Sequence, residues 1–259
     1  MKYELMVHNF FGKQLEVLQE IPGKGDKFPT IIMVPGFGVD LHEYGLFDEI
    51  SDILIRNGFQ TIRFNFEGIG RSHGKFVDMT VDNQAQQIKD IVKYAQKDRY
   101  TETTQMGILT QSFGGPTAIS ALPLPDIKTF VFMSPPAHPE ESLAKYFKRQ
   151  RGFNPEGISE RERSDNRKVR IGPQIWTTLA NHNFLLEIKK LTQPILFIQG
   201  TKDRKVSFRE AQEYYDAVKS KKKLHYIYHG DHGFTREFRP KLLEFVRDWF
   251  NEQLQGVKT

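Results

Sequence analysis

The sequence predicts an α/β protein whose mainly parallel sheet is flanked by helices and interrupted by one insertion. Short apolar runs alternate with segments of helical periodicity along most of the 259 residues, which is the pattern of repeated βαβ units. This alternation stops over residues 137–190 and then resumes. Three polar motifs, at Ser112, Asp203 and His232, each follow an apolar run directly. Because the carboxyl ends of parallel strands meet at one edge of a sheet, these motifs also predict where a site lies.

The first half of the chain carries strands and helices in a regular order. The expected strands cover residues 3–8, 14–21, 30–34 and 60–66, and the expected helices cover 43–57 and a segment that ends near 97. Asn57-Gly58 ends the first helix, because glycine and asparagine accept the left-handed conformation at a helix C-terminus. Thr80 or Asp82 is placed to cap the second helix through a side-chain oxygen.

The second half continues the same alternation on both sides of the insertion. The expected strands cover residues 105–110, 128–134, 194–200 and 223–229, and the expected helices follow Gly114-Gly115, begin at 207 and cover 240–254. Strands that alternate with helices are joined by crossover connections, so we expect neighbouring strands to run parallel.

Residues 137–190 are expected to form a cap (lid) over a core built from residues 1–136 and 191–259. A long segment outside the regular pattern is often functional, and an insertion at this point projects over the edge that carries the three polar motifs. Its aromatic residues Phe153, Trp176 and Phe184 are candidates to line a substrate pocket. The alternative is that they pack the cap against the core, as aromatic side chains at helical spacing usually do.

Ser112 is the candidate nucleophile. It lies between an apolar strand and a helix that opens with Gly114-Gly115, and a sharp strand-to-helix turn of this kind exposes a serine hydroxyl above the sheet. Thr110 stands where glycine is usual in this motif, so its Cβ must fit where helix and strand approach closely. This predicts a slightly altered turn.

A serine becomes nucleophilic only when a histidine takes its proton and an acid orients that histidine, so the two partners decide the matter. Asp203 follows the apolar run 194–200, and His232 follows the next strand along the chain. Asp231 is a poorer orienting group, because the side chain of an adjacent residue generally points away from the imidazole. The expected triad is therefore Ser112, Asp203 and His232, in the chain order Ser, Asp, His.

Ser72 is a second candidate nucleophile, but its sequence context does not support that role. The literal pattern G-x-S-x-G occurs once, at Gly70-Arg71-Ser72-His73-Gly74. The residues that follow do not begin a helix with apolar periodicity, and Ser72 lies at least six residues beyond its strand. The pattern has its meaning only at a strand–turn–helix junction, so Ser72 is not expected to be the nucleophile.

Two backbone amides are expected to form an oxyanion hole, which needs two fixed N–H donors. One comes from the residue after the nucleophile, Phe113, and the other from Phe37 in the loop Val34-Pro35-Gly36-Phe37-Gly38. Glycines on both sides of Phe37 allow the loop to turn its amides inward. A plain turn after a strand is the alternative.

Composition fits one compact domain and excludes several classes of protein. No apolar stretch approaches the length of a membrane helix, and the first residues have no apolar signal-peptide core, so we expect a cytoplasmic protein with no membrane partner. Cysteine is absent, which excludes disulfides and a thiol nucleophile. The histidines have no metal-ligand spacing, and we expect neither a metal nor another cofactor.

The formal net charge of +5 is concentrated in one segment. Residues 145–170 hold nine Lys or Arg against four Asp or Glu, and the remainder is close to neutral. Interleaved aromatic residues would suit nucleic-acid binding, but a charge run is usually a solvated helical face. We therefore expect no nucleic-acid partner. The oligomeric state is left open.

The motifs resemble those of the α/β-hydrolase superfamily over nearly the whole chain. The resemblance rests on PGFG at the oxyanion loop, FNFEGIGRS, QSFGG, TKD and GDHGF. Pro35 replaces a usual histidine, and Glu67 departs from a usual aspartate. GIGRSHGKFVDMT and the moderate insertion resemble the cinnamoyl and feruloyl esterase-like branch. That resemblance implies hydrolysis of carboxylic esters without a cofactor.

These observations predict a serine carboxylesterase that forms an acyl-enzyme and acts on a small-molecule ester, with a feruloyl type as the finer interpretation. The same triad would serve a thioesterase, an acyltransferase or a peptidase, because fold and triad do not determine the acyl donor or acceptor. A non-catalytic binding protein on the same fold is a further alternative, against which the intact triad argues.

Overall fold

The central element of the protein is an eight-stranded sheet. The structure is a computed structural model that describes residues 1–23, 25–163, 166 and 168–256. The strand order is β1-β2-β4-β3-β5-β6-β9-β10. Its strands are β1 (Lys2–His8), β2 (Gln14–Glu20), β3 (Phe28–Val34), β4 (Gln60–Phe64), β5 (Thr101–Gln111), β6 (Ile127–Met133), β9 (Ile195–Gly200) and β10 (Lys222–Ile227). The pairs β1–β2 and β2–β4 are antiparallel, and the remaining pairs are parallel. The expected α/β class and mainly parallel sheet are confirmed.

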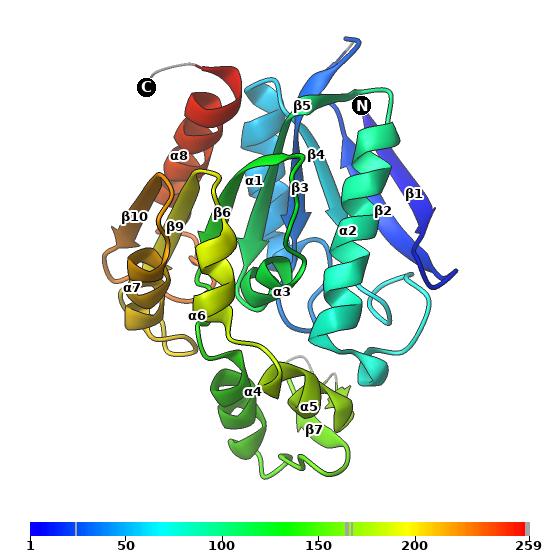
Figure 1. Ribbon diagram of the computed structural model, residues 1–259, viewed down its shortest axis with the longest axis vertical. Coiled ribbons are helices and arrows are strands. Elements are labelled where there is room, and N and C mark those ends of the chain that lie inside the picture. The colour runs from blue at the N-terminus through cyan, green and yellow to red at the C-terminus, as the bar shows by residue number, and fades with distance from the viewer. Residues whose placement is uncertain (24, 164–165, 167, 257–259) are drawn as a thin grey trace.

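Helices cover both faces of the sheet (Figure 1). One face carries α1 (Leu46–Arg56) and α8 (Arg239–Phe250), and the other carries α2 (Val81–Lys97), α3 (Gly114–Ser120) and α7 (Phe208–Ala217). Each central strand serves both layers, because successive side chains point to opposite faces. In β3, for example, Ile32 packs with the α2 layer and Ile31 with the α1 layer. This two-sided burial explains why the central strands read as continuous apolar runs.

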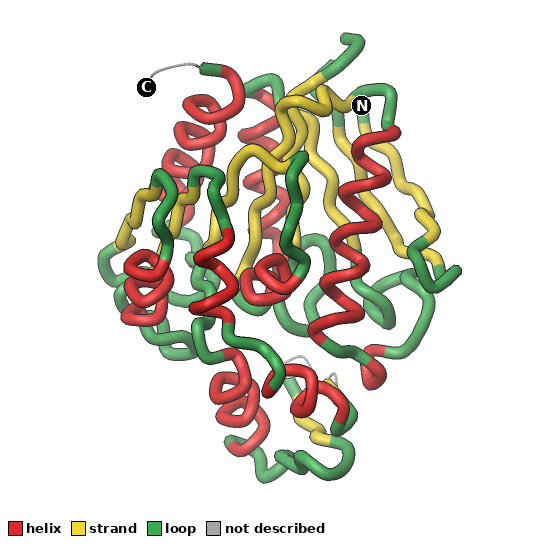
Figure 2. The backbone as a smooth tube through the Cα atoms, viewed as in Figure 1, coloured by secondary structure: helices red, strands yellow, loops and turns green. Residues whose placement is uncertain are grey.

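The insertion lies beyond the carboxyl ends of the parallel strands (Figures 1 and 2). Its elements are α4 (Pro139–Lys148), β7 (Ser159–Glu162), β8 (Lys168–Ile171), α5 (Gln174–Ala180) and α6 (Phe184–Glu187). β7 and β8 form an antiparallel pair that the sequence analysis did not identify, since each strand has only four residues. α6 contacts α3, so the end of the insertion packs on the core.

Element ends differ from the sequence expectations by a few residues. A 3₁₀ turn over Glu43–Gly45 precedes α1, which ends before Asn57-Gly58 as expected. Thr80, and not Asp82, caps α2: its side chain accepts a hydrogen bond from the Asn83 amide. No helix in the described part of the chain is both long and apolar enough to cross a bilayer.

Candidate active site

Ser112 lies at the sharp turn between β5 and α3. Its φ is 52°, in the left-handed region, and its amide donates to the Met133 carbonyl over 2.8 Å. The turn needs a glycine at 114, because a Cβ there would come within 2.7 Å of the carbonyl oxygens of Val34 and Pro35. The strained serine is thus held between two neighbouring strands of the sheet, and its Oγ faces the carboxyl edge.

Thr110 is accommodated without loss of this turn. It is fully buried in β5, between Val34 on β3 and Phe132 on β6. Its Oγ1 has no hydrogen-bond partner among the described residues. The cost of threonine at this position is therefore a buried unpaired hydroxyl, about 1–3 kcal/mol, and the nucleophile's geometry is kept.

The three expected triad residues are brought into one hydrogen-bonded chain. His232 Nε2 lies 2.9 Å from Ser112 Oγ, and His232 Nδ1 lies 2.7 Å from Asp203 Oδ2. They come from the loops after β5, β9 and β10, which all end at the carboxyl edge of the sheet; β9 and β10 are neighbours, and β6 lies between β5 and β9. Gln111 Nε2 donates to the His232 carbonyl over 2.8 Å and so ties the histidine loop to the nucleophile strand.

The side chain of Asp203 is a buried carboxylate. It is 0% exposed, and it accepts hydrogen bonds from the Lys205 amide at 2.8 Å, the Val206 amide at 3.0 Å and Gln199 Nε2 at 3.0 Å. Burial alone would raise the pKa of Asp203. The hydrogen bond and charge of His232, with the two amides, outweigh burial and hold the pKa below its ordinary value. The carboxylate therefore stays ionised beside the imidazole.

Asp231 and Ser72 have other roles in the structure. Asp231 accepts from the Thr235 amide at 2.9 Å and the Thr235 hydroxyl at 3.1 Å, which stabilises its own turn. Ser72 is buried, donates to the Asn65 carbonyl over 2.7 Å and accepts from the Glu16 amide over 2.9 Å. Both side chains are thus engaged in loop structure, and neither is hydrogen-bonded to Ser112 or His232 in the described part of the chain.

The amides of Phe37 and Phe113 are the expected oxyanion donors. Within the described part of the chain, neither amide donates a hydrogen bond to another protein group. Their rings meet edge to face with centroids 5.9 Å apart, which places the two loops against each other beside Ser112. The Phe37 carbonyl accepts from Arg163 Nη2 over 2.8 Å, so a residue of the insertion fixes the oxyanion loop.

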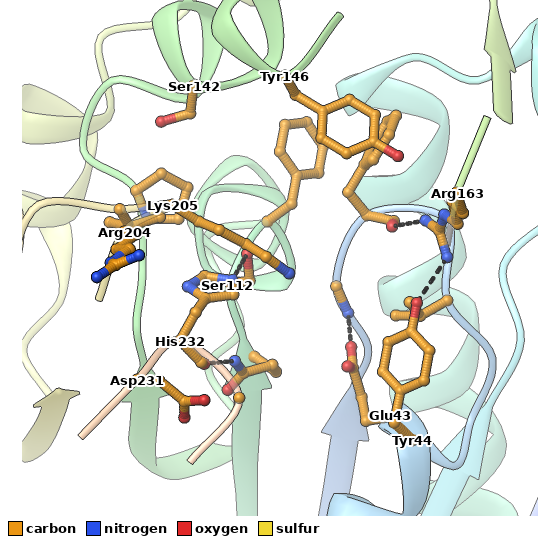
Figure 3. A pocket seen from close by; sticks show the side chains of 18 of the residues that line it. Glu43, Tyr44, Ser112, Ser142, Tyr146, Arg163, Arg204, Lys205, Asp231 and His232 are labelled. Atoms are coloured by element: carbon orange, nitrogen blue, oxygen red, sulfur yellow. Dashed lines mark hydrogen bonds between the residues drawn. The ribbon is translucent and has the colours of Figure 1, made fainter. Parts of the chain in front are cut away.

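Glu43 also lines the pocket, although no sequence motif predicts it. Its carboxylate accepts a hydrogen bond from the Gly36 amide in the oxyanion loop (Figure 3). Burial raises the pKa of Glu43 to about 7 against the pull of that hydrogen bond and of Lys205. Both Glu43 and Tyr44 adopt positive φ values, 46° and 55°. No spacing rule singles out an acid at this point, and only the folded loop reveals its burial.

A pocket of about 1260 Å³ opens above Ser112 and is shared by the core loops and the insertion. Its aromatic lining residues are Phe37, Tyr44, Phe113 and Tyr146. Figure 3 shows Tyr146 on the far side of the pocket from the nucleophile. The insertion therefore contributes directly to the walls around the triad.

The three aromatic residues expected to line a pocket do not line this one. Trp176 is 7% exposed and packs edge to face on Phe153, with ring centroids 5.1 Å apart. Phe184 is 5% exposed and stacks on His182. Trp176 and Phe184 thus take the alternative role of packing residues, because their helices turn the rings toward the core. Phe153 borders a separate hollow beside α4.

The fold and this arrangement define an α/β hydrolase, as the motifs predicted. The family model described as the prolyl oligopeptidase family (Peptidase S9) matches residues 47–257. The chain belongs to that family. No curated protein sequence matches it.

Several solved structures have the same fold at low sequence identity. Est1E from Butyrivibrio proteoclasticus, solved with bound ferulic acid, is 23% identical, with a TM-score of 0.82 over 97% of this chain and 100% of that chain. Esterase Pf2001 from Pyrococcus furiosus is 19% identical, with a TM-score of 0.76 over 98% of this chain and 92% of that chain. The esterase domain of a Rhodothermus marinus protein is 16% identical, with a TM-score of 0.75 over 98% and 99% of the two chains.

Proposed function

We propose that the protein is a serine carboxylesterase that hydrolyses small carboxylic esters through an acyl-enzyme intermediate. The observation that carries this proposal is the hydrogen-bonded chain from Ser112 Oγ through His232 to the buried Asp203, which opens onto a large pocket. An intact chain of this kind activates a serine for attack on an acyl carbon.

The first half-reaction forms the acyl-enzyme. His232 Nε2 takes the proton of Ser112 Oγ as the oxygen attacks the ester carbonyl, and Asp203 stabilises the imidazolium. The carbonyl oxygen becomes an oxyanion that accepts hydrogen bonds from the Phe37 and Phe113 amides. Collapse of the tetrahedral intermediate breaks the ester C–O bond, and Nε2 returns its proton to the leaving alkoxide, which departs as the alcohol.

The second half-reaction releases the acid. A water gives its proton to His232 Nε2 and attacks the acyl carbon, and the second tetrahedral intermediate is held by the same two amides. Its collapse breaks the bond to Ser112 Oγ, which recovers the proton from Nε2. The triad returns to its starting protonation, and the two half-reactions use only these protein groups, the ester and water.

The finer proposal is that the acyl group is of hydroxycinnamate type and that residues 137–190 act as a cap over it. Support comes from the fold shared with Est1E, which was solved with ferulic acid, and from the aromatic walls supplied by Phe37 and Tyr146. Planar aromatic rings pack well edge to face against such side chains. The cap supplies Tyr146 from α4 and Arg163 after β7.

A peptidase is the second candidate, and the match to the prolyl oligopeptidase family favours it. The same triad cleaves amides, but an amine is a poorer leaving group than an alcohol and needs protonation at the right position. The two functions are therefore separated by the leaving group.

Turnover of matched substrates tests the proposal. We expect hydrolysis of p-nitrophenyl butyrate and methyl ferulate, no hydrolysis of aminoacyl and prolyl p-nitroanilides, and covalent labelling of Ser112 by a fluorophosphonate. Labelling with anilide turnover alone would establish the peptidase. Absence of labelling would exclude both.

A further inference from the structure

The pocket above Ser112 is lined by many more cations than anions. Of its described lining residues, eight are Lys or Arg and three are Asp or Glu, whereas the whole chain has 37 against 32. The basic lining residues are Lys145, Arg149, Arg161, Arg163, Lys202, Arg204, Lys205 and Arg239. The positive charge of this protein is therefore concentrated around its candidate active site.

The three lining acids leave most of this charge uncompensated. Glu43, Glu162 and Asp231 form no ion pair with a lining cation among the described residues. Burial raises the pKa of Glu43 to about 7, so this carboxyl carries only part of a charge at neutral pH. Asp231 is bound to Thr235.

Two of the lining cations already interact with other groups of the protein. Arg239 pairs with Glu49, and Arg161 donates to the Tyr146 carbonyl over 2.6 Å while its guanidinium stacks on the Tyr146 ring. The exposed Lys205 has no carboxylate within ion-pair distance in the part of the chain that is described. Its ammonium group is therefore the better candidate to meet a ligand.

Lys205 is anchored by the catalytic acid itself. Its backbone amide donates to Asp203 Oδ1 over 2.8 Å, and Val206, which follows it, is buried and makes a second such bond. From this fixed base the side chain extends into the pocket that Ser112 and His232 also line (Figure 3). The root of the side chain is thus preorganised, and only its flexible end must be ordered by a ligand.

Arg163 supplies a second cation at the other wall. Its Nη1 donates to the Tyr44 hydroxyl over 3.0 Å and its Nη2 to the Phe37 carbonyl over 2.8 Å, which hold the guanidinium in place. Lys205 and Arg163 both act electrostatically on Glu43, so the two cations flank the same region of the pocket. A flexible ammonium and a fixed planar guanidinium together suit the oxygens of a carboxylate or phosphate.

We propose that the natural substrate is an ester that carries an anionic group, a carboxylate or phosphate, which Lys205 and Arg163 bind beside the nucleophile. This inference rests on the proposed esterase function and narrows its substrate class. It also gives the basic run of the insertion a role, since Arg163 belongs to that run and faces the pocket. A substrate anion would be attracted by the summed positive field of the pocket before it reaches these two residues.

Two pairs of esters test the preference. Mono-p-nitrophenyl glutarate against p-nitrophenyl valerate places the anion on the acyl part, and 4-(valeryloxy)benzoic acid against 4-(valeryloxy)benzamide places it on the alcohol part. We expect kcat/KM to favour the anionic member of at least one pair by about tenfold, the effect of one charge-assisted contact. Added salt should reduce this ratio.

Lys205→Gln is the diagnostic variant, because it removes the charge and keeps most of the side chain. The ratio of anionic to neutral turnover should fall by about five- to tenfold. The matched control is Lys189→Gln, which removes one exposed positive charge outside the pocket and should keep the wild-type ratio. Equal ratios for both members of each pair, or a preference that survives in Lys205→Gln, would overturn the inference.

Direct binding separates this inference from the esterase proposal. Calorimetric titration of Ser112→Ala protein with glutarate and with inorganic phosphate needs no turnover, and it shows which oxyanion is preferred. We expect at least one to bind, and its Kd to rise about five- to tenfold when Lys205→Gln is added. Anion binding to the Ser112→Ala protein without ester turnover by the wild type would contradict the esterase proposal and support the anion site. Ester turnover without anion binding or a preference for anionic esters would support the esterase proposal and contradict the anion site.

Discussion

Ser112 combines backbone strain with a precise set of partners. A non-glycine residue at positive φ costs of order 1–3 kcal/mol, and the turn keeps this conformation because Met133 and the close approach of Gly114 to β3 hold it. Ser72 has the literal sequence motif but none of these features: its hydroxyl is saturated by two backbone groups. At the residue scale, context and not the motif separates a candidate nucleophile from a structural serine.

Substitution of the two serines should separate these roles. We expect Ser112→Ala to lower kcat for an activated ester by roughly five to six orders of magnitude, because the nucleophile is lost. Ser72→Ala should retain most of the activity and lower stability by about 1–3 kcal/mol, since the Glu16 amide and Asn65 carbonyl lose their partner. Steady-state kinetics and urea unfolding measure both. Full activity of Ser112→Ala would refute the assignment.

The two neighbouring carboxylates allow a similar comparison. Asp203→Asn should lower kcat by about 10⁴-fold, because asparagine no longer favours the histidine tautomer that accepts from Ser112. Asp231→Asn should cost far less, because Asp231 bonds only to Thr235 in its own turn. Kinetics of the two purified variants on one ester decide the matter. Similar losses at both positions would mean that the orienting acid is misplaced.

At the scale of elements, one set of residues of the insertion lines the pocket and another set packs its interior. α4 and the segment after β7 face the pocket through Tyr146 and Arg163. α5 turns Trp176 inward against Phe147 and Phe153. The sequence could indicate the insertion and its aromatic content, but helical spacing alone did not distinguish a ring that faces substrate from one that packs the cap, because both positions are apolar.

Trp176→Ala should therefore change stability and not specificity. Removal of a buried tryptophan leaves a cavity that costs about 3–5 kcal/mol, and Trp176 is 7% exposed. We expect a lower melting temperature and an unchanged ranking of esters by acyl group, measured on p-nitrophenyl esters of graded chain length. A selective loss for long or aromatic acyl groups at wild-type stability would instead place Trp176 at the substrate.

At the scale of the whole molecule, the sequence could predict what depends on local pattern. The alternation of strands and helices and the chain order of the three polar loops can be read from short segments of sequence, whereas the division at residues 137–190 stays a prediction. The spatial order of the strands, with β4 between β2 and β3, depends on packing between distant segments. Glu43 was not predicted for the same reason, since the groups that interact with its buried carboxyl, among them Gly36, Arg163 and Lys205, come from segments far apart in the sequence.

Burial of Glu43 should make the stability of the whole fold depend on pH. Its pKa is raised from 4.5 to about 7, with Asp40, Lys205 and Arg163 nearby. The folded state thus binds the proton more tightly than the unfolded chain, so this contribution is complete below about pH 4.5 and is lost as the pH rises through about 7. The total is of order 3 kcal/mol.

Glu43→Gln removes this titration while an amide oxygen can still accept from the Gly36 amide. Urea unfolding at about pH 5 and about pH 8 should show that the variant gains roughly 2.5 kcal/mol relative to wild type at the higher pH. Glu141→Gln, at an exposed position of α4, is the matched control and should follow the wild-type slope. Parallel curves for wild type and Glu43→Gln would show that the Glu43 carboxyl is ionised throughout this range. Lys205 and Arg163 would then stabilise the Glu43 carboxylate, and the Gly36 amide would donate to a charged group and not to a neutral one.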